Sequence, residues 1–505
     1  MNERTDVAII GGGLAGLSLA LQLTRRIPGV EVAVVDRGRR PAEERTSTVG
    51  ESFAELGAHY LRDVVGMADH LENDELPKLG LRFFVGDHWD LGERFELGVL
   101  DPAICEVRDG RLVGLPLRTH QVDRARLENE MARRCVEAGV HLIEETHVTE
   151  CRLDPGGHSL ILGGERGGAL DSSWVVFASN GPVPGHRLER RPLGHRIGAR
   201  WFRAEGELDV GSWSDDPVYV GRTFPGFRRL STNHFMGRGY WMWLIPLPSG
   251  VTSVGVVYDP ALMDRLPDTH EGLHRWIEAH DVRLAHELGG RAPVETEPHA
   301  IEADSFVTRC FHPDRWAVVG GAAAFADVLY SPGADLIALG NTLLTGLIER
   351  DRAGDRLAGA CAVANRVFEG FAEGLAEIYR GHYGNFGVPE VVGPKVVWDS
   401  ALYFGFNTLL FRHGLTGDVQ FLSRIQPELL TLRALQTRVQ ERFRRGDPAP
   451  VLPTGYTTVD WGHIDWLMSS YYGAERQPDE EGVIRHLRDV IESLERMARR
   501  MEGSA

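Results

Sequence analysis

The chain has 505 residues, of which 43% are hydrophobic and 25% are charged, and its net charge at pH 7 is −17. This length exceeds one compact core, so we expect two or three domains. The acidic balance argues against nucleic acid or an anionic membrane as the main partner. The sequence contains no run of about 18 uncharged apolar residues, so we expect no membrane-spanning helix.

The cysteines favour a reducing compartment, because they lie far apart and form no C-x-x-C pair. They are Cys105, Cys135, Cys151, Cys310 and Cys361. We expect packed, reduced thiols, no metal site and a cytoplasmic protein. The N-terminus agrees with this expectation, since it enters a strand at Asp6 without a basic and apolar leader.

The first 36 residues carry the clearest pattern. An apolar strand over 7–10 is followed by Gly11-Gly12-Gly13-Leu14-Ala15-Gly16, a helix over 17–24 and a second strand over 32–36. Gly11 allows the tight turn, Gly13 lets the backbone approach a pyrophosphate, and Gly16 lets helix and strand pack closely. The helix N-terminus then offers free N–H groups and the positive end of its dipole to the phosphates.

An acidic residue completes this pattern. Asp36 closes the second strand about twenty residues after Gly16, where its carboxylate can accept hydrogen bonds from ribose hydroxyls. Leu14 and Ala15 at the helix start, and Arg37 beside Asp36, are the further cofactor contacts that we expect. Because all parts fall in order, the sequence predicts a βαβ unit that binds a dinucleotide, but these residues alone do not separate FAD from NAD.

The rest of the chain alternates between sheet and helix. We expect a helix over 121–139, and strands over 140–145, 148–153 and 174–178 that extend the first sheet. Residues 195–260 form strands rich in aromatic residues, and a helix follows near 269–288. A strand, a glycine-rich turn and a helix return over 316–350. Residues 356–505 are predicted mostly helical, with charged amphipathic runs at 424–445 and 480–502. We interpret the last run as a solvated face rather than a binding tail.

Several motifs together resemble the FAD-dependent monooxygenase superfamily. They are the glycine loop, Thr48-Val49-Gly50-Glu51-Ser52, His120-Gln121-Val122-Asp123-Arg124 and a late glycine turn. Within that superfamily, Trp241-Met242-Trp243-Leu244-Ile245-Pro246 matches the W-x-W-x-I-P signature of flavin-dependent halogenases, the tryptophan halogenase family. The resemblance covers roughly residues 1–350 and implies FAD as cofactor, with Glu51 and Ser52 near the flavin ring and Arg124 among the cofactor contacts.

This resemblance sets the expected fold class and domains. We expect an α/β protein with a Rossmann-type FAD-binding domain, a mixed or antiparallel substrate sheet and a mostly helical C-terminal region. The FAD-binding domain would cover 1–185 and be completed by 300–355. The substrate sheet would cover 186–300 and the helical domain 356–505.

The two tryptophans are candidate catalytic residues. On a strand, Trp241 and Trp243 point to the same face and Met242 to the other. The resemblance implies that the indoles stand between flavin and substrate and keep the flavin from oxygenating the substrate directly. An aromatic core strand would explain the same residues without any catalytic role.

A lysine is the third candidate. Residues 77–83, Pro-Lys-Leu-Gly-Leu-Arg-Phe, resemble the K-x-G-x-x-F segment that carries the catalytic lysine of halogenases. The resemblance implies that the Lys78 amine lies between flavin and substrate and binds hypohalous acid. A partly desolvated amine suits this role as a donor or as a nucleophile. The basic residues of this chain are mostly arginine, which makes a lysine here more informative, although a surface lysine before a strand is the alternative.

The late turn, residues 320–333, resembles the family turn that passes the ribityl chain and the flavin ring. Gly321 stands where the family has an aspartate that binds the ribityl hydroxyls, and Val328 stands where it has a proline. Asp327, Gly321, Gly333 and Ala334 are the cofactor contacts that this resemblance implies.

The same turn would hold the halide. In halogenases, two backbone N–H groups after the serine bind it, and these positions follow Ser331 as Pro332 and Gly333. Proline has no N–H to donate. Ser331 and Gly333 are therefore the predicted halide contacts, and Ala334 or a side chain would have to replace the missing donor. Losing one charge-assisted bond of about 1.5–3 kcal/mol would lower halide affinity about tenfold or more.

The leading hypothesis is an FADH2- and O2-dependent halogenase of secondary metabolism. A separate flavin reductase would supply FADH2, because we find no second glycine fingerprint for NAD(P)H. Chloride or bromide would be the halide. Tyr330 stands where tryptophan halogenases carry a glutamate, so a phenol, or an aryl or polyene acyl group on a carrier protein, fits better than free tryptophan.

Three alternatives stay open. One is a monooxygenase that transfers oxygen to the substrate, and another is an oxidoreductase resembling geranylgeranyl reductases, which saturate double bonds. The third is a flavoprotein that binds the cofactor without turnover. W-x-W-x-I-P favours the halogenase over the reductase, and Pro332 favours the reverse.

Overall fold

The structure is a computed structural model that describes residues 3–42, 49–99, 106–108, 111–113, 117–164, 167–179, 181, 188–448, 452, 458–459, 467, 469–471, 473 and 479–503. Thr48 and Cys105, named above, lie outside these residues. Contacts divide the chain into two compact units. The first holds residues 1–75, 122–194 and 304–376, and the second holds 76–121, 195–303 and 377–505.

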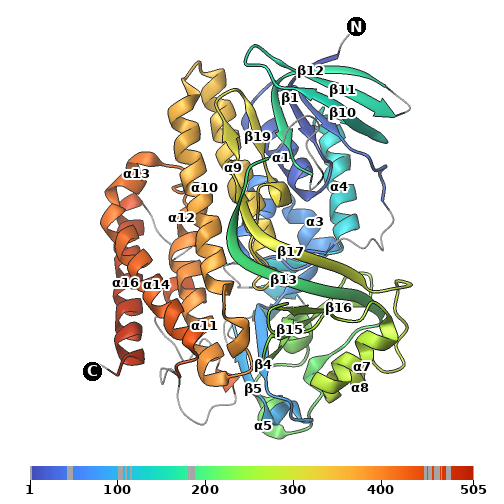
Figure 1. The fold of residues 1–505 in the computed structure, drawn as a ribbon, viewed down its shortest axis with the longest axis vertical. Coiled ribbons are helices and arrows are strands. Elements are labelled where there is room, and N and C mark those ends of the chain that lie inside the picture. The colour runs from blue at the N-terminus through green and yellow to red at the C-terminus, as the bar shows by residue number, and fades with distance from the viewer. Residues whose placement is uncertain are drawn as a thin grey trace. The chain divides into compact units, whose positions relative to one another are not determined.

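The first unit contains the predicted Rossmann sheet, in the strand order β10-β11-β12-β1-β2-β9 (Figure 1). The strands are β1 (Glu3–Ile10), β2 (Val32–Val35), β9 (His141–Ile143), β10 (Thr146–Arg152), β11 (His158–Gly164) and β12 (Gly168–Phe177). β12, β1, β2 and β9 run parallel, and β11 and β10 continue the sheet antiparallel. β19 (Trp316–Val318) joins β12 in parallel and pairs with β18 (Phe311–His312). This confirms that the predicted later strands extend the first sheet.

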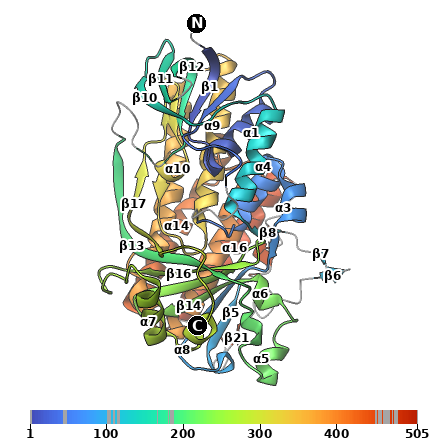
Figure 2. The same cartoon turned by 90° about the vertical axis from the view of Figure 1, so that its right-hand side faces the viewer.

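The helices of the first unit include one, α1 (Leu14–Arg26), that connects two adjacent parallel strands, β1 and β2. The others include α2 (Glu55–His59), α3 (Ala68–Asp74), α4 (Arg124–Glu137) and α9 (Pro332–Arg352). Figure 2 shows α1 and α4 side by side next to the parallel strands. The helix predicted over 121–139 starts later, because Gln121 ends the strand β8 (Thr119–Gln121). Asp123 is the N-cap residue of α4, in extended backbone.

The second unit is built on a sheet in the order β17-β13-β16-β15-β14-β4-β5-β21 (Figure 1). Its strands are β4 (Leu81–Val85), β5 (Phe95–Gly98), β13 (Arg190–Glu205), β14 (Thr232–Gly237), β15 (Tyr240–Pro246), β16 (Val251–Tyr258), β17 (His299–Thr308) and β21 (Thr458–Val459). β4 pairs with β14 in parallel, whereas β13 to β16 pair antiparallel. A separate two-stranded sheet pairs β3 (Leu76–Lys78) with β8.

The two faces of this sheet differ in composition. One face carries Phe84, Phe235 and Met242, which form a buried apolar core. α7 (His270–His280) and α8 (Val282–Leu288) cover this face, with Leu273 and Leu284 in the same core. The helix predicted over 269–288 is therefore two helices, because Asp281 leaves helical geometry and caps α8. Since side chains alternate along a strand, the residues between these positions face the other side.

The C-terminal part is mostly helical, as predicted. Its longer helices are α10 (Leu357–Tyr379), α11 (Pro389–Leu402), α14 (Gln426–Arg445) and α16 (Glu480–Met501). α11, α14 and α16 contact one another. Both predicted amphipathic runs are helices, and α16 buries one face, which includes Leu487 and Leu494. Among the described helices, none is long and apolar enough to cross a membrane.

Candidate flavin site and lysine–tryptophan site

The glycine loop between β1 and α1 has the predicted geometry. Gly11 has φ +118°, and a Cβ on Gly16 would lie 1.9 Å from the carbonyl oxygen of Gly11. A Cβ on Gly13 would meet no described atom within 4 Å. Gly11 and Gly16 are thus required by the turn itself, whereas Gly13 keeps space open in front of the backbone. That open space fits the pyrophosphate of a dinucleotide.

The N-terminus of α1 faces this space. Gly13 is its N-cap residue and, in the described part of the chain, no side chain caps the helix. Leu14 and Ala15, which open the helix, are buried. The first turn contains no acidic residue, so the positive end of the dipole is not neutralised. Uncapped N–H groups with this polarity suit a bound phosphate.

Asp36 lies where the pattern predicts it, directly after β2, and its backbone N–H donates to the Ile143 carbonyl at 2.9 Å. The neighbouring Arg37 is exposed. Arg40 instead reaches the loop, where its Nη2 donates to the Gly12 carbonyl at 2.6 Å and lies 3.7 Å from Asp36 Oδ2. Arg40 was not predicted from the sequence, because Arg37, Arg39 and Arg40 follow one another too closely for spacing to select one of them.

Arg124, at the start of α4, is held by two contacts. Its Nη1 donates to the Val49 carbonyl at 2.6 Å and its Nη2 to Glu128 Oε1 at 2.5 Å. Its Nε is buried and has no partner among the described residues. A buried guanidinium N–H without an acceptor fits a site that is completed by an anionic ligand. Glu51 and Ser52, which belong to the separate motif over 48–52, are both buried.

The late glycine turn lies against the start of α1. Gly320, in the 3₁₀ turn η5 (Gly320–Ala322), has φ +67°, and a Cβ there would lie 2.7 Å from the Cβ of Ala15. Gly321 is exposed. Asp327 is buried, and its Oδ1 accepts hydrogen bonds from the backbone N–H groups of the two following residues at 2.6 and 2.9 Å. The two glycine turns therefore meet, as one cofactor lying across both would require.

α9 begins after a strained segment. Tyr330 and Ser331 both have positive φ, at 67° and 62°, where non-glycine residues are uncommon. Pro332 occupies the first helical position, and no side chain caps α9 within the described residues. The next two N–H groups of the first turn belong to Gly333 and Ala334. Both donors therefore lie at the uncapped end of the helix, where Ala334 can replace the N–H that Pro332 lacks. Strain of this kind is concentrated at functional sites.

In the second unit, Lys78 is a buried residue rather than a surface lysine. Its exposed fraction is 2%, and it ends β3, paired with Thr119 of β8. The hydroxyl of Thr119 donates to the Lys78 carbonyl at 3.2 Å. Lys78 and Lys395 are the only lysines of the chain, and Lys395, also 2% exposed, forms an ion pair with Asp399. Every other basic side chain apart from histidine is an arginine, so lysine occurs here only in the interior.

A row of rings crosses the sheet on the face opposite to the apolar core. The register aligns Phe83, His234, Trp243 and Gly255 on four neighbouring strands. The rings of Phe83 and His234 stack with centroids 4.6 Å apart, and Trp241 lies 5.3 Å from His234 and 5.8 Å from Trp243. The structure therefore confirms that the two tryptophans share one face. His234 was not predicted, because only the register brings it to them.

Each indole N–H of this pair has a partner. Trp241 Nε1 donates to the hydroxyl of Tyr383 at 3.0 Å, and Trp243 Nε1 donates to Ser253 Oγ at 3.1 Å. A Cβ on Gly255 would lie 2.1 Å from the Trp243 ring. Gly255 therefore gives the indole its space on the neighbouring strand. The orientation of both rings is fixed by packing and by hydrogen bonds.

His234 packs against the rings and also responds to the charge of Lys78. Burial lowers the pKa of His234 to about 3, hydrogen bonding to backbone carbonyls opposes this change, and the positive charge of Lys78 lowers the pKa further. The imidazole is therefore neutral at physiological pH. Its Nδ1 lies 3.1 Å from the carbonyl oxygen of Arg82, which acts as the acceptor and so puts the proton on Nδ1. His234 therefore adds no positive charge to that of Lys78.

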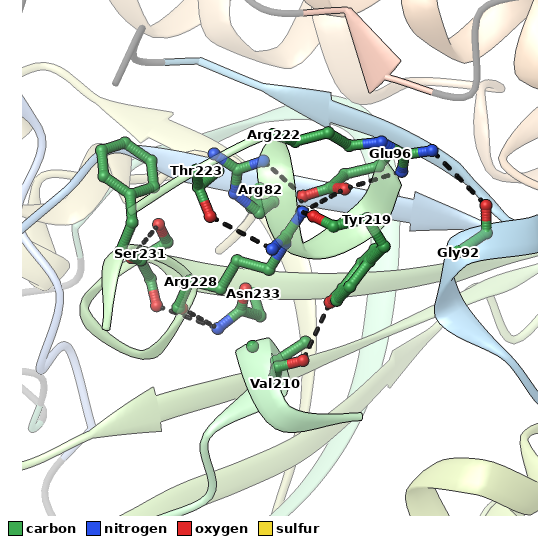
Figure 3. Close-up of polar contacts among 12 residues, drawn as sticks. Arg82, Gly92, Glu96, Val210, Tyr219, Arg222, Thr223, Arg228, Ser231 and Asn233 are labelled. Atoms are coloured by element: carbon green, nitrogen blue, oxygen red, sulfur yellow. Dashed lines mark hydrogen bonds and ion pairs between the residues drawn. The ribbon is translucent and has the colours of Figure 1, made fainter. Parts of the chain in front are cut away.

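A buried ionic cluster, which we call the Glu96 cluster, lies on the core side of the same sheet. Figure 3 shows Arg82, Arg222 and Arg228 converging on the carboxylate of Glu96. Arg228 binds it through Nε at 2.8 Å and Nη2 at 3.0 Å. Burial by itself raises the pKa of Glu96, but the charges and hydrogen bonds of Arg82 and Arg228 lower it to about 2. The cluster ties β4 and β5 to the helices that precede β14.

The chain is similar to a known family and to several known proteins. The family described as FAD dependent oxidoreductase matches residues 6–200. The flavin-dependent halogenase chlA of Dictyostelium discoideum is 24% identical over 79% of this chain and 69% of its own length. A 1H-pyrrole-2-carbonyl-[peptidyl-carrier protein] chlorinase of Pseudomonas fluorescens is 26% identical over 66% of this chain and 72% of its own.

A solved structure shares the fold. Halogenase PltM in complex with phloroglucinol and FAD superposes with a TM-score of 0.63, at 16% identity, over 98% of this chain and 96% of that one. The matched family confirms FAD as the cofactor predicted for the first unit. The sequence relatives are halogenases by name, as the W-x-W-x-I-P resemblance predicted.

Proposed function

We propose that this chain, an FAD-dependent oxidoreductase related to the flavin-dependent halogenases, is itself an FADH2- and O2-dependent halogenase of secondary metabolism. The observation that carries the proposal is the buried Lys78 on the same unit as the ring row of Trp241 and Trp243. Burial removes water from the Lys78 amine, and a desolvated amine is a strong hydrogen-bond donor or, once neutral, a nucleophile. A halogenase would use this amine to bind the oxidised halogen.

The overall reaction would consume FADH2, O2, a halide ion, a proton and an aromatic C–H compound, and would yield FAD, the aryl halide and two water molecules. Bound FADH2 supplies the two electrons that reduce O2 while the halide is oxidised. The open glycine loop, the uncapped start of α1 and Arg124 would hold its phosphates. We assign Gly321, Asp327, Glu51 and Ser52 to the neighbourhood of the ribityl chain and ring.

Lys78 would bind the oxidised halogen and direct it to the substrate carbon. An ammonium in a buried site is a strong hydrogen-bond donor, and the neutral imidazole of His234 adds no competing positive charge. The substrate carbon would form its bond to halogen and lose its proton. Trp241 and Trp243 would exclude water from this path, since both indoles are buried and fixed.

The halide would bind at the start of α9. Gly333 and Ala334 are the two N–H donors that follow Pro332 at the uncapped helix start. The first turn also contains Asp335, whose Oδ1 accepts from the backbone N–H of Gly57 at 2.8 Å. Ser331, held at positive φ, would direct the chain so that these groups face the ligand. Chloride and bromide both suit such a site.

The proposed partners follow from this chemistry. A separate flavin reductase would deliver FADH2, and the substrate would be an electron-rich aromatic compound or an acyl group on a carrier protein. The second option is supported by the name of one relative, which acts on a carrier-bound pyrrole. We also propose a cytoplasmic enzyme, supported by cysteines that lie far apart in the sequence and form no C-x-x-C pair.

The test is an assay with purified protein, FAD, a flavin reductase, NADH, bromide and a panel of phenols, together with a carrier-bound pyrrolyl substrate. A brominated product that requires both bromide and the enzyme is expected. Stoichiometric hydrogen peroxide without any brominated product across the panel would contradict the proposal.

Pro332 favours a second candidate, a monooxygenase without halide chemistry, because it removes one expected halide donor. In the same assay this enzyme would yield hydroxylated product, with a rate that does not depend on bromide. A reductase would instead saturate a polyene without oxygen. The products therefore separate the three readings.

A further inference from the structure

The two tryptophans of the ring row are held from different parts of the chain. Trp243 donates to Ser253, which lies on the adjacent strand of the same sheet. Trp241 donates to Tyr383, which is 142 residues away in the 3₁₀ turn η6 (Tyr383–Asn385). The second tryptophan is thus oriented by the sheet itself, and the first by the helical C-terminal segment.

Tyr383 is a fixed acceptor. Its side chain is fully buried, and its ring packs against Phe386 and His195 at centroid distances of 4.7 and 5.5 Å. Its backbone carbonyl also accepts a hydrogen bond from the N–H of Gly239 at 2.8 Å. Gly239 lies in the turn that joins β14 to β15, directly before the tryptophan strand. Backbone and side chain of Tyr383 therefore bind the same hairpin.

A neighbouring glycine strengthens this attachment. A Cβ on Gly387 would lie 3.1 Å from the backbone N of Arg238, so the segment after η6 runs against the hairpin at backbone distance. The hydroxyl of Tyr383 is then held in place before any substrate binds. Such preorganisation is what a residue needs to orient another side chain.

We propose that Tyr383 is a positioning residue that fixes the indole of Trp241 and thereby keeps the oxidised halogen on the path to the substrate. The effect on the reaction rests on the proposed halogenase function, whereas the hydrogen bond between Trp241 and Tyr383 does not. Without the phenol oxygen, the buried indole N–H loses its acceptor and the ring is free to change rotamer. Water then gains access, and reduced flavin and O2 are spent as FAD and hydrogen peroxide.

The contact is tested without activity by NMR of the indole N–H groups in protein labelled with 15N-tryptophan, which has 11 tryptophans. Trp241→Phe identifies the signal of Trp241. In Tyr383→Phe we expect this signal to move and its hydrogen exchange to accelerate by about fivefold or more, the loss of one net hydrogen bond. Tyr379→Phe is the matched control, because Tyr379 is also fully buried and packs on His195, and it should leave the signal in place.

The consequence is tested by counting products. For each FADH2 consumed, Tyr383→Phe should give about fivefold less brominated product and correspondingly more hydrogen peroxide, with FAD affinity unchanged. A Trp241 signal that does not move overturns the positioning role. A moved signal with an unchanged amount of brominated product per FADH2 consumed overturns it as well. If the wild type makes no brominated product while the signal moves as expected, the halogenase proposal fails and the contact stands, so the two failures are distinguishable.

Discussion

An added carbon on Gly16 would lie 1.9 Å from the Gly11 carbonyl oxygen, and one on Gly255 would lie 2.1 Å from the ring of Trp243. Both glycines are obligatory, but for different reasons. The first is required by the backbone of its own loop, five residues earlier in the chain, and the second by a side chain on the neighbouring strand. The flavin loop is thus built from backbone with side chains removed, whereas the lysine–tryptophan site is built from side chains packed across strands.

The two sites should therefore respond differently to substitution. A backbone site depends on local spacing and tolerates changes elsewhere in the sheet. A side-chain site depends on register, burial and the pairing of charged groups beneath it. Three substitutions and one change of pH would distinguish the two sites.

Glu96→Gln should cause the largest loss of stability. The change leaves Arg82, Arg222 and Arg228 around a neutral amide in a buried site, which costs roughly 3–5 kcal/mol of unfolding free energy. Urea unfolding at pH 7 measures it. Because the folded pKa of Glu96 is about 2 and its ordinary value is 4.5, the wild type keeps this stabilisation above pH 4.5 and loses it as the pH falls toward 2. Exposed Glu278→Gln is the control and should change little.

Lys78→Met should abolish halogenation while the protein still binds FAD. The substitution keeps an unbranched buried chain and removes only the amine, so the rate should fall by about 100-fold or more. Initial rates of bromination and flavin fluorescence titrations measure the two properties. Unchanged bromination would remove Lys78 from the mechanism, and loss of FAD binding would show that the variant damages more than the amine.

Gly13→Ala should weaken FAD binding about tenfold, a loss of about 1.4 kcal/mol, without destabilising the apoprotein. The added methyl meets no described atom and would occupy the space in front of the helix start. Gly16→Ala is the contrasting variant, because its methyl overlaps the Gly11 carbonyl and should destabilise the fold itself. Equal unfolding midpoints for the two variants would contradict the backbone reading of the loop.

Mild acid should destabilise the second site through His234. Its folded pKa is about 3 and its ordinary value is 6.5, so below pH 6.5 the unfolded chain takes up a proton that the folded chain refuses. The cost is roughly 1.4 kcal/mol at pH 5.5 relative to pH 7.5. The comparison of wild type and His234→Asn by urea unfolding at both pH values isolates this contribution. Equal pH dependence in both proteins would show that His234 titrates normally.

The first site was largely predictable from sequence, because its residues follow one another. Gly11, Gly13, Gly16 and Asp36 needed only spacing, and the structure confirms the strand, turn, helix and strand that carry them. The start of α4 was placed three residues early, since Gln121 belongs to a strand whose partner lies 45 residues upstream. Arg40 could not be predicted, because its contact with the Gly12 carbonyl depends on tertiary packing and not on its spacing from the other arginines.

The second site was predictable only in part. The alternation along residues 241–246 predicted that both tryptophans share a face, but His234, Ser253 and Tyr383 reach them from other segments. The burial of Lys78 was also out of reach of the pattern, because β3 pairs with a strand 41 residues further along. Long-range pairings of this kind leave no local signal in the sequence.

The interior position of both lysines has a practical consequence. With Lys78 and Lys395 each 2% exposed, the folded protein presents hardly any lysine amine to acylating reagents or amine-directed cross-linkers. Labels coupled through lysine should therefore attach slowly to the native protein and rapidly once it opens. Acetylation of the two lysines, located by mass spectrometry of peptides, would then report unfolding, and acetylation of Lys78 alone would report the opening of the candidate catalytic site.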